Sequence, residues 1–187
     1  MTSAELTVGA LASAMQRWGF LEDPAPAAAV RWIETFLAAY GSELARVEDA
    51  RSAIAALRAE ACIVPALELE RLRSRDVLFF LDSVSQYVDH QRELRDLPLA
   101  ADLAEIAREF GISKEDALAC TRMAITGAKS GPPLELLFPL LGHDRIMIRI
   151  GAISSALLHG RGFEPIRFGP DGKPFEPIRG SRDPEDA

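Results

Sequence analysis

The sequence lacks the features that mark several classes of protein. It has only 2 cysteines among its 187 residues. Cys62 and Cys120 both lie in apolar helical patterns, where we expect buried free thiols rather than a disulfide. No apolar run approaches the roughly 20 residues that a membrane span requires, and the polar N-terminus is unlike a signal peptide. We therefore expect a soluble, cytoplasmic protein that does not enter a membrane.

Positive charge is also in short supply. The chain has 21 lysines and arginines against 28 aspartates and glutamates, which gives a formal net charge of −7. Binding to nucleic acid depends largely on attraction between phosphates and clustered cations, so an acidic chain must concentrate its few cations locally. The charge balance therefore excludes strong binding to nucleic acid over a broad surface.

The motifs of common enzymes are missing as well. His90, His143 and His159 are isolated, and none lies at metal-ligand spacing from cysteine or acidic residues. The sequence has no nucleophile elbow, no phosphate-binding glycine loop after a strand and no dinucleotide fingerprint. We therefore predict no catalytic residues, no metal and no cofactor.

What the sequence does contain is helical patterning. Hydrophobic residues make up 48% of the chain, alanine, leucine, glutamate and arginine are abundant, and β-branched alternation is scarce. This composition predicts an all-α fold, a helical bundle of two subdomains. Apolar spacing and breaker residues predict helices over 4–18, 26–39, 47–57, 67–97 (as one helix or two), 99–110, 113–126, 134–141 and 146–158.

Proline and glycine divide the chain. Pro98 marks the boundary between the subdomains, and Ser42 is expected to cap the third helix. In the C-terminal tail, the sequence Phe-Glu-Pro-Ile-Arg at 163–167 recurs at 175–179. Such short repeats bury no core, so they form either a surface extension or a motif that binds a partner. We expect an N-terminal helical subdomain over 1–97, a C-terminal helical subdomain over 98–160 and a Pro/Gly-rich tail over 161–187.

The densest run of helix and turn signals extends from Cys120 to Arg149. It includes Thr-Arg-Met-Ala-Ile-Thr-Gly at 121–127, then Gly-Pro-Pro-Leu at 131–134 and Leu-Leu-Gly at 140–142, followed by Asp144-Arg145 and Arg149-Ile150. These segments resemble the C-terminal, anticodon-binding end of bacterial glutamyl-tRNA synthetases. The family has Leu-Arg-x-Ala-Leu-Thr-Gly, a short loop, Leu-Leu-Gly, Glu-Arg and Arg-Leu there. The likeness is specific over about 100–158 and rests on helix spacing over 5–99.

The resemblance implies an all-helical pair of subdomains that grips the anticodon loop of tRNA. In the family a catalytic domain precedes this one and carries His-Ile-Gly-His and Lys-Met-Ser-Lys-Ser type signatures. Neither signature occurs in this sequence. The resemblance therefore implies a free-standing, non-catalytic homologue that does not charge tRNA by itself and could assist a synthetase.

The same resemblance names candidate RNA-binding residues. Arg122 falls on the family arginine that contacts anticodon bases, a task that suits a planar fork of hydrogen-bond donors. A surface ion pair with Glu115 or Asp116 is the alternative. Tyr40 falls, in a looser alignment, where the family has a second arginine, and its ring would either stack on a base or simply end a helix. The loop candidates are Lys129, Gly131, Pro132 and Leu134, the last three where the family packs against an anticodon base.

Two functions from different classes follow. In the first, the chain is a tRNA-binding domain that contacts the anticodon, either weakly on its own or as an accessory to glutamyl-tRNA aminoacylation. In the second, it is a helical module that kept the fold, lost RNA binding and now binds a synthetase or another protein. The sequence does not specify which tRNA or protein is bound, or the oligomeric state.

Overall fold

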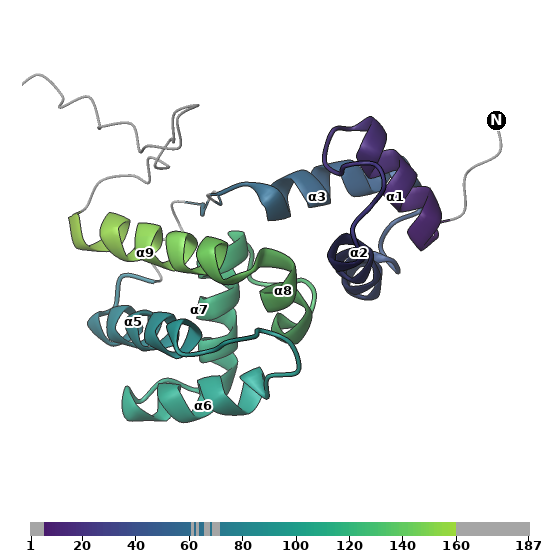
Figure 1. Cartoon of the computed structure of the whole chain (residues 1–187). Helices are drawn as coiled ribbons and strands as arrows, with labels where there is room; N and C mark the ends of the chain where they lie inside the picture. Colours follow the sequence, from purple (N-terminus) through teal and green to yellow (C-terminus); the bar gives the residue numbers. More distant parts are fainter. Residues whose placement is uncertain (1–5, 61, 63, 66–67, 69–71, 160–187) are drawn as a thin grey trace, which may run out of the picture.

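The computed structural model describes residues 6–60, 62, 64–65, 68 and 72–159, and every regular element in these residues is a helix (Figure 1). The all-α prediction is therefore confirmed. Within the same residues, no helix is both long and apolar enough to cross a membrane. The repeated motif of the tail lies outside the described residues.

The N-terminal elements are α1 (Val8–Arg17), α2 (Ala27–Tyr40), the short 3₁₀ helix η1 (Val47–Asp49) and α3 (Ala50–Arg58). Each α-helix buries one apolar face, because its large hydrophobic residues recur at helical spacing. The hydroxyl of Thr7 caps α1 by accepting a hydrogen bond from the backbone N–H of Ala10 at 3.2 Å.

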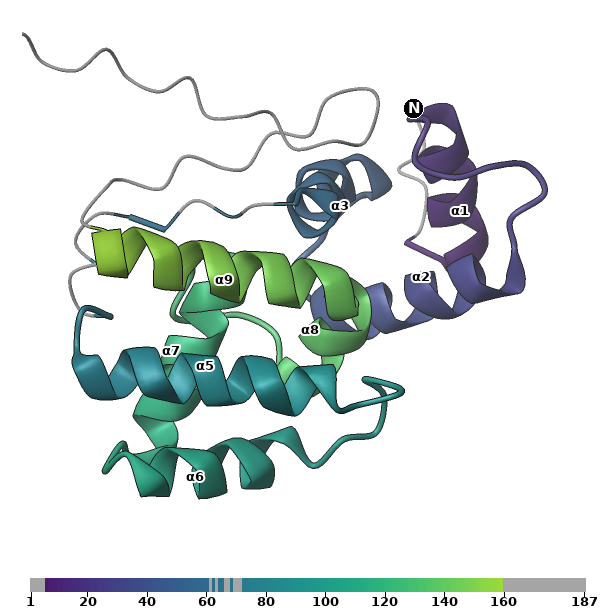
Figure 2. The same cartoon turned by 60° about the vertical axis from the view of Figure 1, so that its left-hand side comes forward.

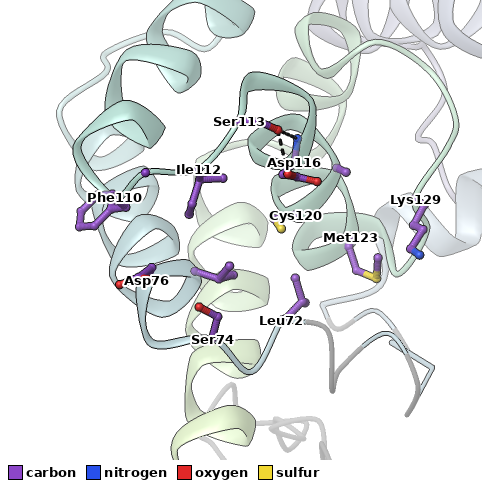
Figure 3. Close-up of a pocket in the computed structure, with 13 residues that line it drawn as sticks. Leu72, Ser74, Asp76, Phe110, Ile112, Ser113, Asp116, Cys120, Met123 and Lys129 are labelled. Atoms are coloured by element: carbon purple, nitrogen blue, oxygen red, sulfur yellow. Dashed lines mark hydrogen bonds between the residues drawn. The ribbon is translucent and has the colours of Figure 1, made fainter.

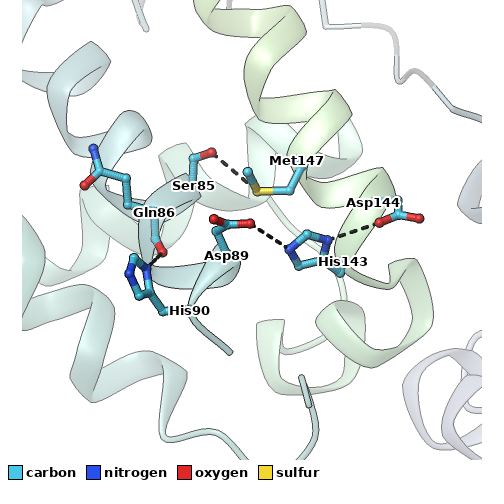
Figure 4. A network of polar contacts seen from close by, with 7 residues as sticks. All are labelled: Ser85, Gln86, Asp89, His90, His143, Asp144 and Met147. Atoms are coloured by element: carbon cyan, nitrogen blue, oxygen red, sulfur yellow. Dashed lines mark hydrogen bonds and ion pairs between the residues drawn. The ribbon is translucent and has the colours of Figure 1, made fainter. Parts of the chain in front are cut away.

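The second group of helices contains α5 (Arg75–Asp89), α6 (Leu99–Glu109), α7 (Lys114–Thr126), α8 (Leu134–Leu141) and α9 (His143–His159). Helices α5 and α9 lie side by side along their length (Figure 2). They are antiparallel, because His143 at the start of α9 lies 3.4 Å from Asp89 at the end of α5 (Figure 4). One turn further along, the Ser85 hydroxyl donates to the Met147 sulfur at 3.4 Å.

A continuous core joins the two groups. Helix α2 packs against α8, and the indole N–H of Trp32 donates to the carbonyl oxygen of Leu140 at 2.9 Å. Along α2 the ring of Trp32 stacks on Phe36, which in turn stacks on Tyr40. A division at Pro98 remains a prediction, and it would separate α5 from α9, its most extensive packing partner.

Two of the differences from the predicted helices concern the end of α5 and the start of the third helix. The helix expected to continue to Leu97 ends at Asp89, because Leu94 turns into the core and Pro98 disfavours a helical conformation in the residue before it. Ser42 does not begin a helix. The element starts at Val47, where the carboxylate of Asp49 accepts a hydrogen bond from the Arg46 backbone N–H at 3.0 Å.

Candidate nucleic-acid interface

A hollow of about 290 Å³ opens beside the C-terminal end of α7. Its walls come from α2, α3, α7, α9 and the loop between α7 and α8. We call it the Arg122 hollow; its lining includes Tyr40, Leu57, Arg122, Thr126, Gly131 and Arg149.

The local structure of α7 sets the position of Arg122. Ser113 caps the start of the helix by accepting a hydrogen bond from the Asp116 backbone N–H at 3.1 Å. At the other end the chain reverses at Gly127, whose φ of 77° favours glycine. The Thr126 hydroxyl donates to the Arg122 carbonyl oxygen at 2.8 Å and accepts from the Ala128 N–H at 3.2 Å. Arg122 therefore lies one helical turn before the end of α7, which an exposed loop follows.

The side chain of Arg122 bridges the helix and that loop. Its Nη1 donates to the carbonyl oxygen of Pro132. Burial lowers the pKa of the guanidinium, and the nearby Glu135 and Tyr40 act in the opposite direction. The side chain stays charged at neutral pH and has five N–H donors. Within the described residues it forms no ion pair with Glu115 or Asp116, and the Pro132 carbonyl is the one hydrogen-bond partner of its guanidinium there.

Arg149 has a different task at the floor of the hollow. It is only 2% exposed. Its Nη1 donates to the Ile125 carbonyl oxygen at 2.5 Å, and its Nη2 donates to those of Ala56 at 2.7 Å and Ala59 at 2.5 Å. These carbonyls lie at the C-terminal ends of α7 and α3, where no intrahelical N–H reaches them. Arg149 therefore ties two helix ends to α9 and supports the hollow from below.

Sequence reasoning missed this supporting role, although the sequence held a signal for it. Arg149 shares its helix face with Ile146, Ile150 and Ile153, all of them buried. An arginine within such a stripe is expected to be buried as well, and a buried cation requires several hydrogen-bond acceptors.

Two further cations near the hollow in the sequence are also engaged within the protein. The Nε of Arg145 donates to the Arg58 carbonyl oxygen at 3.1 Å, again at the end of α3. The Nζ of Lys129 lies 2.9 Å from a carboxylate oxygen of Glu68. Little positive charge beyond that of Arg122 therefore reaches this part of the surface.

Tyr40 forms the aromatic side of the hollow. Its ring stacks on Phe36 with a centroid distance of 5.1 Å and an interplanar angle of 24°. Burial and the neighbouring Glu43 raise the pKa of the phenol, against the opposing effect of Arg122 and Arg149. The tyrosine stays neutral at physiological pH and ends a stack that begins at Trp32.

The six candidate residues do not share one face. Tyr40, Arg122, Gly131 and Pro132 line the hollow. Lys129 lies instead in a second cavity beside Cys120 (Figure 3), because it extends towards Glu68. Leu134 is 2% exposed, because the apolar face of α8 that it begins packs into the core. Lys129 and Leu134 therefore do not line the hollow together with Arg122.

Among the described residues, no group of three His, Cys, Asp or Glu residues could hold a metal ion. Cys62 and Cys120 are free thiols, as predicted, with Cys62 buried and Cys120 partly buried.

A model of the anticodon binding domain family matches residues 11–153. The chain therefore belongs to this family, and the matched range contains the whole Arg122 hollow. Searches of curated proteins and of solved structures gave no match.

Proposed function

We propose that the chain binds tRNA and that the Arg122 hollow receives a base of the anticodon loop. The observation that carries the proposal is the state of Arg122, a half-buried guanidinium with no carboxylate partner among the described residues. Family membership supplies the class of ligand. The proposal concerns recognition only and assigns no catalytic step to the chain.

The chemistry of the hollow suits a single unstacked base. Arg122 offers a planar fork of donors to base acceptors, and Tyr40 offers a ring on which a base can stack. The volume of about 290 Å³ is at the small end of the roughly 300–1,000 Å³ found for ligand pockets. The exposed loop at Gly131 would allow the RNA backbone to approach closely, because glycine has no side chain there.

The expected affinity is low. A bidentate arginine contributes about 1–3 kcal/mol of base discrimination, and a stacked base about 1–3 kcal/mol. A micromolar complex requires about 8 kcal/mol. Lys129, Arg145 and Arg149 are already bonded within the protein, so they contribute little attraction to phosphates. We expect measurable binding only at low ionic strength.

The resemblance to glutamyl-tRNA synthetases supports a finer proposal. We infer that the preferred ligand is tRNA specific for glutamate, and that the chain assists glutamylation of that tRNA. Titration of the glutamate tRNA beside a second elongator tRNA tests the preference. Equal affinity for both tRNAs would contradict the preference for glutamate tRNA, but it would not contradict the proposal that the chain binds tRNA.

A fluorescence titration with labelled tRNA at low salt tests the general proposal. We expect Arg122→Ala to weaken binding by roughly 5- to 100-fold, as the loss of one bidentate contact predicts. Arg108→Ala is the matched control, because Arg108 is an exposed arginine on α6 that pairs with Glu105 at 3.2 Å. It should bind as the wild type does. Absence of binding by the wild type, or equal binding by all three proteins, would contradict the proposal.

The second candidate function is a helical module that binds a protein. Two observations favour it: the net charge of −7 and the engagement of three nearby cations within the fold. It predicts that an affinity purification recovers one specific protein in the absence of RNA, and that Arg122→Ala leaves this recovery unchanged.

A further inference from the structure

The second cavity lies on a different face of α7 from the Arg122 hollow. It has a volume of about 410 Å³ and is formed by the start of α5, the turn between α6 and α7, and α7 itself (Figure 3). We call it the Cys120 groove; its lining includes Leu72, Asp76, Phe110, Ile112, Asp116 and Cys120. It shares no lining residue with the Arg122 hollow.

The lining combines apolar groups, the carboxylates of Asp76 and Asp116, and Lys129, whose Nζ pairs with Glu68 at 2.9 Å. Phe110 and Ile112 are only partly buried and present hydrophobic surface to the groove. The exposed carboxylates of Asp76 and Asp116 lie beside them. Such a surface fits a short peptide that carries aromatic and aliphatic side chains together with a cation.

The packing of α9 directs the end of the described chain towards this groove. Asp89 pairs with His143, and one turn away Ser85 contacts Met147. Because the two helices are antiparallel, the end of α9 lies beside the start of α5, as Figure 2 shows. The start of α5 forms one wall of the groove.

The sequence that follows α9 has the chemistry that the groove requires. Phe-Glu-Pro-Ile-Arg occurs at 163–167 and again at 175–179. Each copy carries one phenylalanine, one isoleucine and one arginine, together with one glutamate that makes the motif neutral overall. Residues 160–174 separate α9 from the second copy, and the root-mean-square reach of a random-coil chain of that length is roughly 20 Å. Two copies on one tether also raise the local concentration of the motif.

We propose that the Cys120 groove is a docking site for the chain's own segment 163–179, which occupies it through one Phe-Glu-Pro-Ile-Arg motif at a time. The phenylalanine and isoleucine cover Phe110 and Ile112, and the arginine lies beside Asp76 and Asp116. Docking covers the Cys120 thiol. The proposal does not rest on the proposed function, because the two surfaces share no residue.

Alkylation of Cys120 in the full chain tests the docking. Burial, assisted by Asp116, raises the pKa of this thiol to about 11, so rates are compared at one fixed pH. Mass spectrometry follows the Cys120 peptide, with the buried Cys62 as an internal reference for folding. We expect Phe163→Ala with Phe175→Ala to raise the Cys120 rate by roughly three- to tenfold, the protection expected for a millimolar effective concentration of a weak motif. The Cys62 rate should not change.

Two controls make the result specific. Phe168→Ala removes a phenylalanine that lies between the two motifs and should leave the Cys120 rate unchanged. Asp76→Asn weakens the groove itself and should raise the rate, whereas Glu48→Gln, a matched loss of charge on η1, should not. Equal rates in the double variant and in Phe168→Ala would overturn the proposal. Protection that disappears on dilution would also overturn it, because the tail of a second copy would then be the occupant.

Discussion

Arginine residues in this small protein do three different jobs, and the surroundings of each decide which. Arg122 is half-buried and donates to one carbonyl oxygen, and the proposed function assigns its other donors to a base. Arg149 is buried and bonded to the ends of two helices. Arg108 is exposed in an ion pair within one helix, a contact worth little.

The first prediction concerns Arg149. We expect Arg149→Met to lower the free energy of unfolding by about 3 kcal/mol or more, because several buried carbonyls lose charged donors. Arg145→Met is the control, since Arg145 bonds carbonyls at longer distances near the surface, and it should cost about 1 kcal/mol. Urea denaturation measures both. An Arg149→Met protein no less stable than Arg145→Met would refute the supporting role.

A second prediction at this scale concerns Tyr87, whose hydroxyl donates to Asp102 at 2.6 Å. Burial and this carboxylate raise the pKa of the phenol well above 10.0. The folded protein therefore holds this proton more tightly than the unfolded chain, and the resulting stability is present below about pH 10 and lost as the pH rises further.

Tyr87→Phe should reduce stability by about 1 kcal/mol at pH 7 through loss of the hydrogen bond. The difference between wild type and variant should then shrink as the pH rises above 10, because only the wild type carries the titrating group. Denaturation at a series of pH values measures this. A difference that stays constant up to pH 11 would show that the Tyr87 pKa is not raised.

The position of a residue could be predicted from the sequence where a local motif determines it. It could not be predicted where contacts with residues distant in the sequence determine it. The motif placed Arg122 near the end of a helix that a loop follows, as observed. The direction of Lys129 depends on Glu68, which is far away in the sequence. The burial of Leu134 depends on how α8 packs. Local patterns contain neither piece of information.

At the scale of elements, the helix ends carry most of the specific contacts. Helix α3 is short, and its last carbonyls are satisfied from α9 by Arg145 and Arg149. Helix periodicity predicted most of the elements, because burial of an amphipathic face is a local property of the sequence. The end of α5 at Asp89 was missed, because it depends on Leu94 reaching the core.

Two glycine-to-alanine substitutions, one in the turn between α8 and α9 and one within α9, should change stability in opposite directions. Gly142 has a φ of 76° and a ψ of 163°, a conformation almost restricted to glycine, although an added Cβ would meet no atom. Gly142→Ala should therefore destabilise the protein by roughly 1–3 kcal/mol through backbone strain. Gly151 lies within α9 with equally open space, so Gly151→Ala should stabilise by about 0.5–1 kcal/mol.

Thermal denaturation of the two glycine variants gives the comparison directly. Because both substitutions add the same methyl group, only the backbone conformation differs between them. Shifts of the melting temperature in the same direction would contradict this account of the turn.

At the scale of the whole molecule, the acidic balance and the family relationship point in opposite directions. A chain with a net charge of −7 attracts RNA poorly over most of its surface. Membership of the anticodon binding domain family is compatible with this charge if recognition is concentrated in one hollow. We expect a low affinity for tRNA because Lys129, Arg145 and Arg149 are bonded within the protein. We expect the contact to be confined to the Arg122 hollow because the proposal places the base beside Arg122.

A nucleotide-resolution footprint on tRNA tests whether the Arg122 hollow contacts the anticodon loop. Chemical probing of the glutamate tRNA at low salt, with and without the protein, compares wild type with Arg122→Ala. We predict that the wild type protects bases of the anticodon loop and that Arg122→Ala loses this protection. Protection confined to other parts of the tRNA, or equal protection by both proteins, would contradict the account.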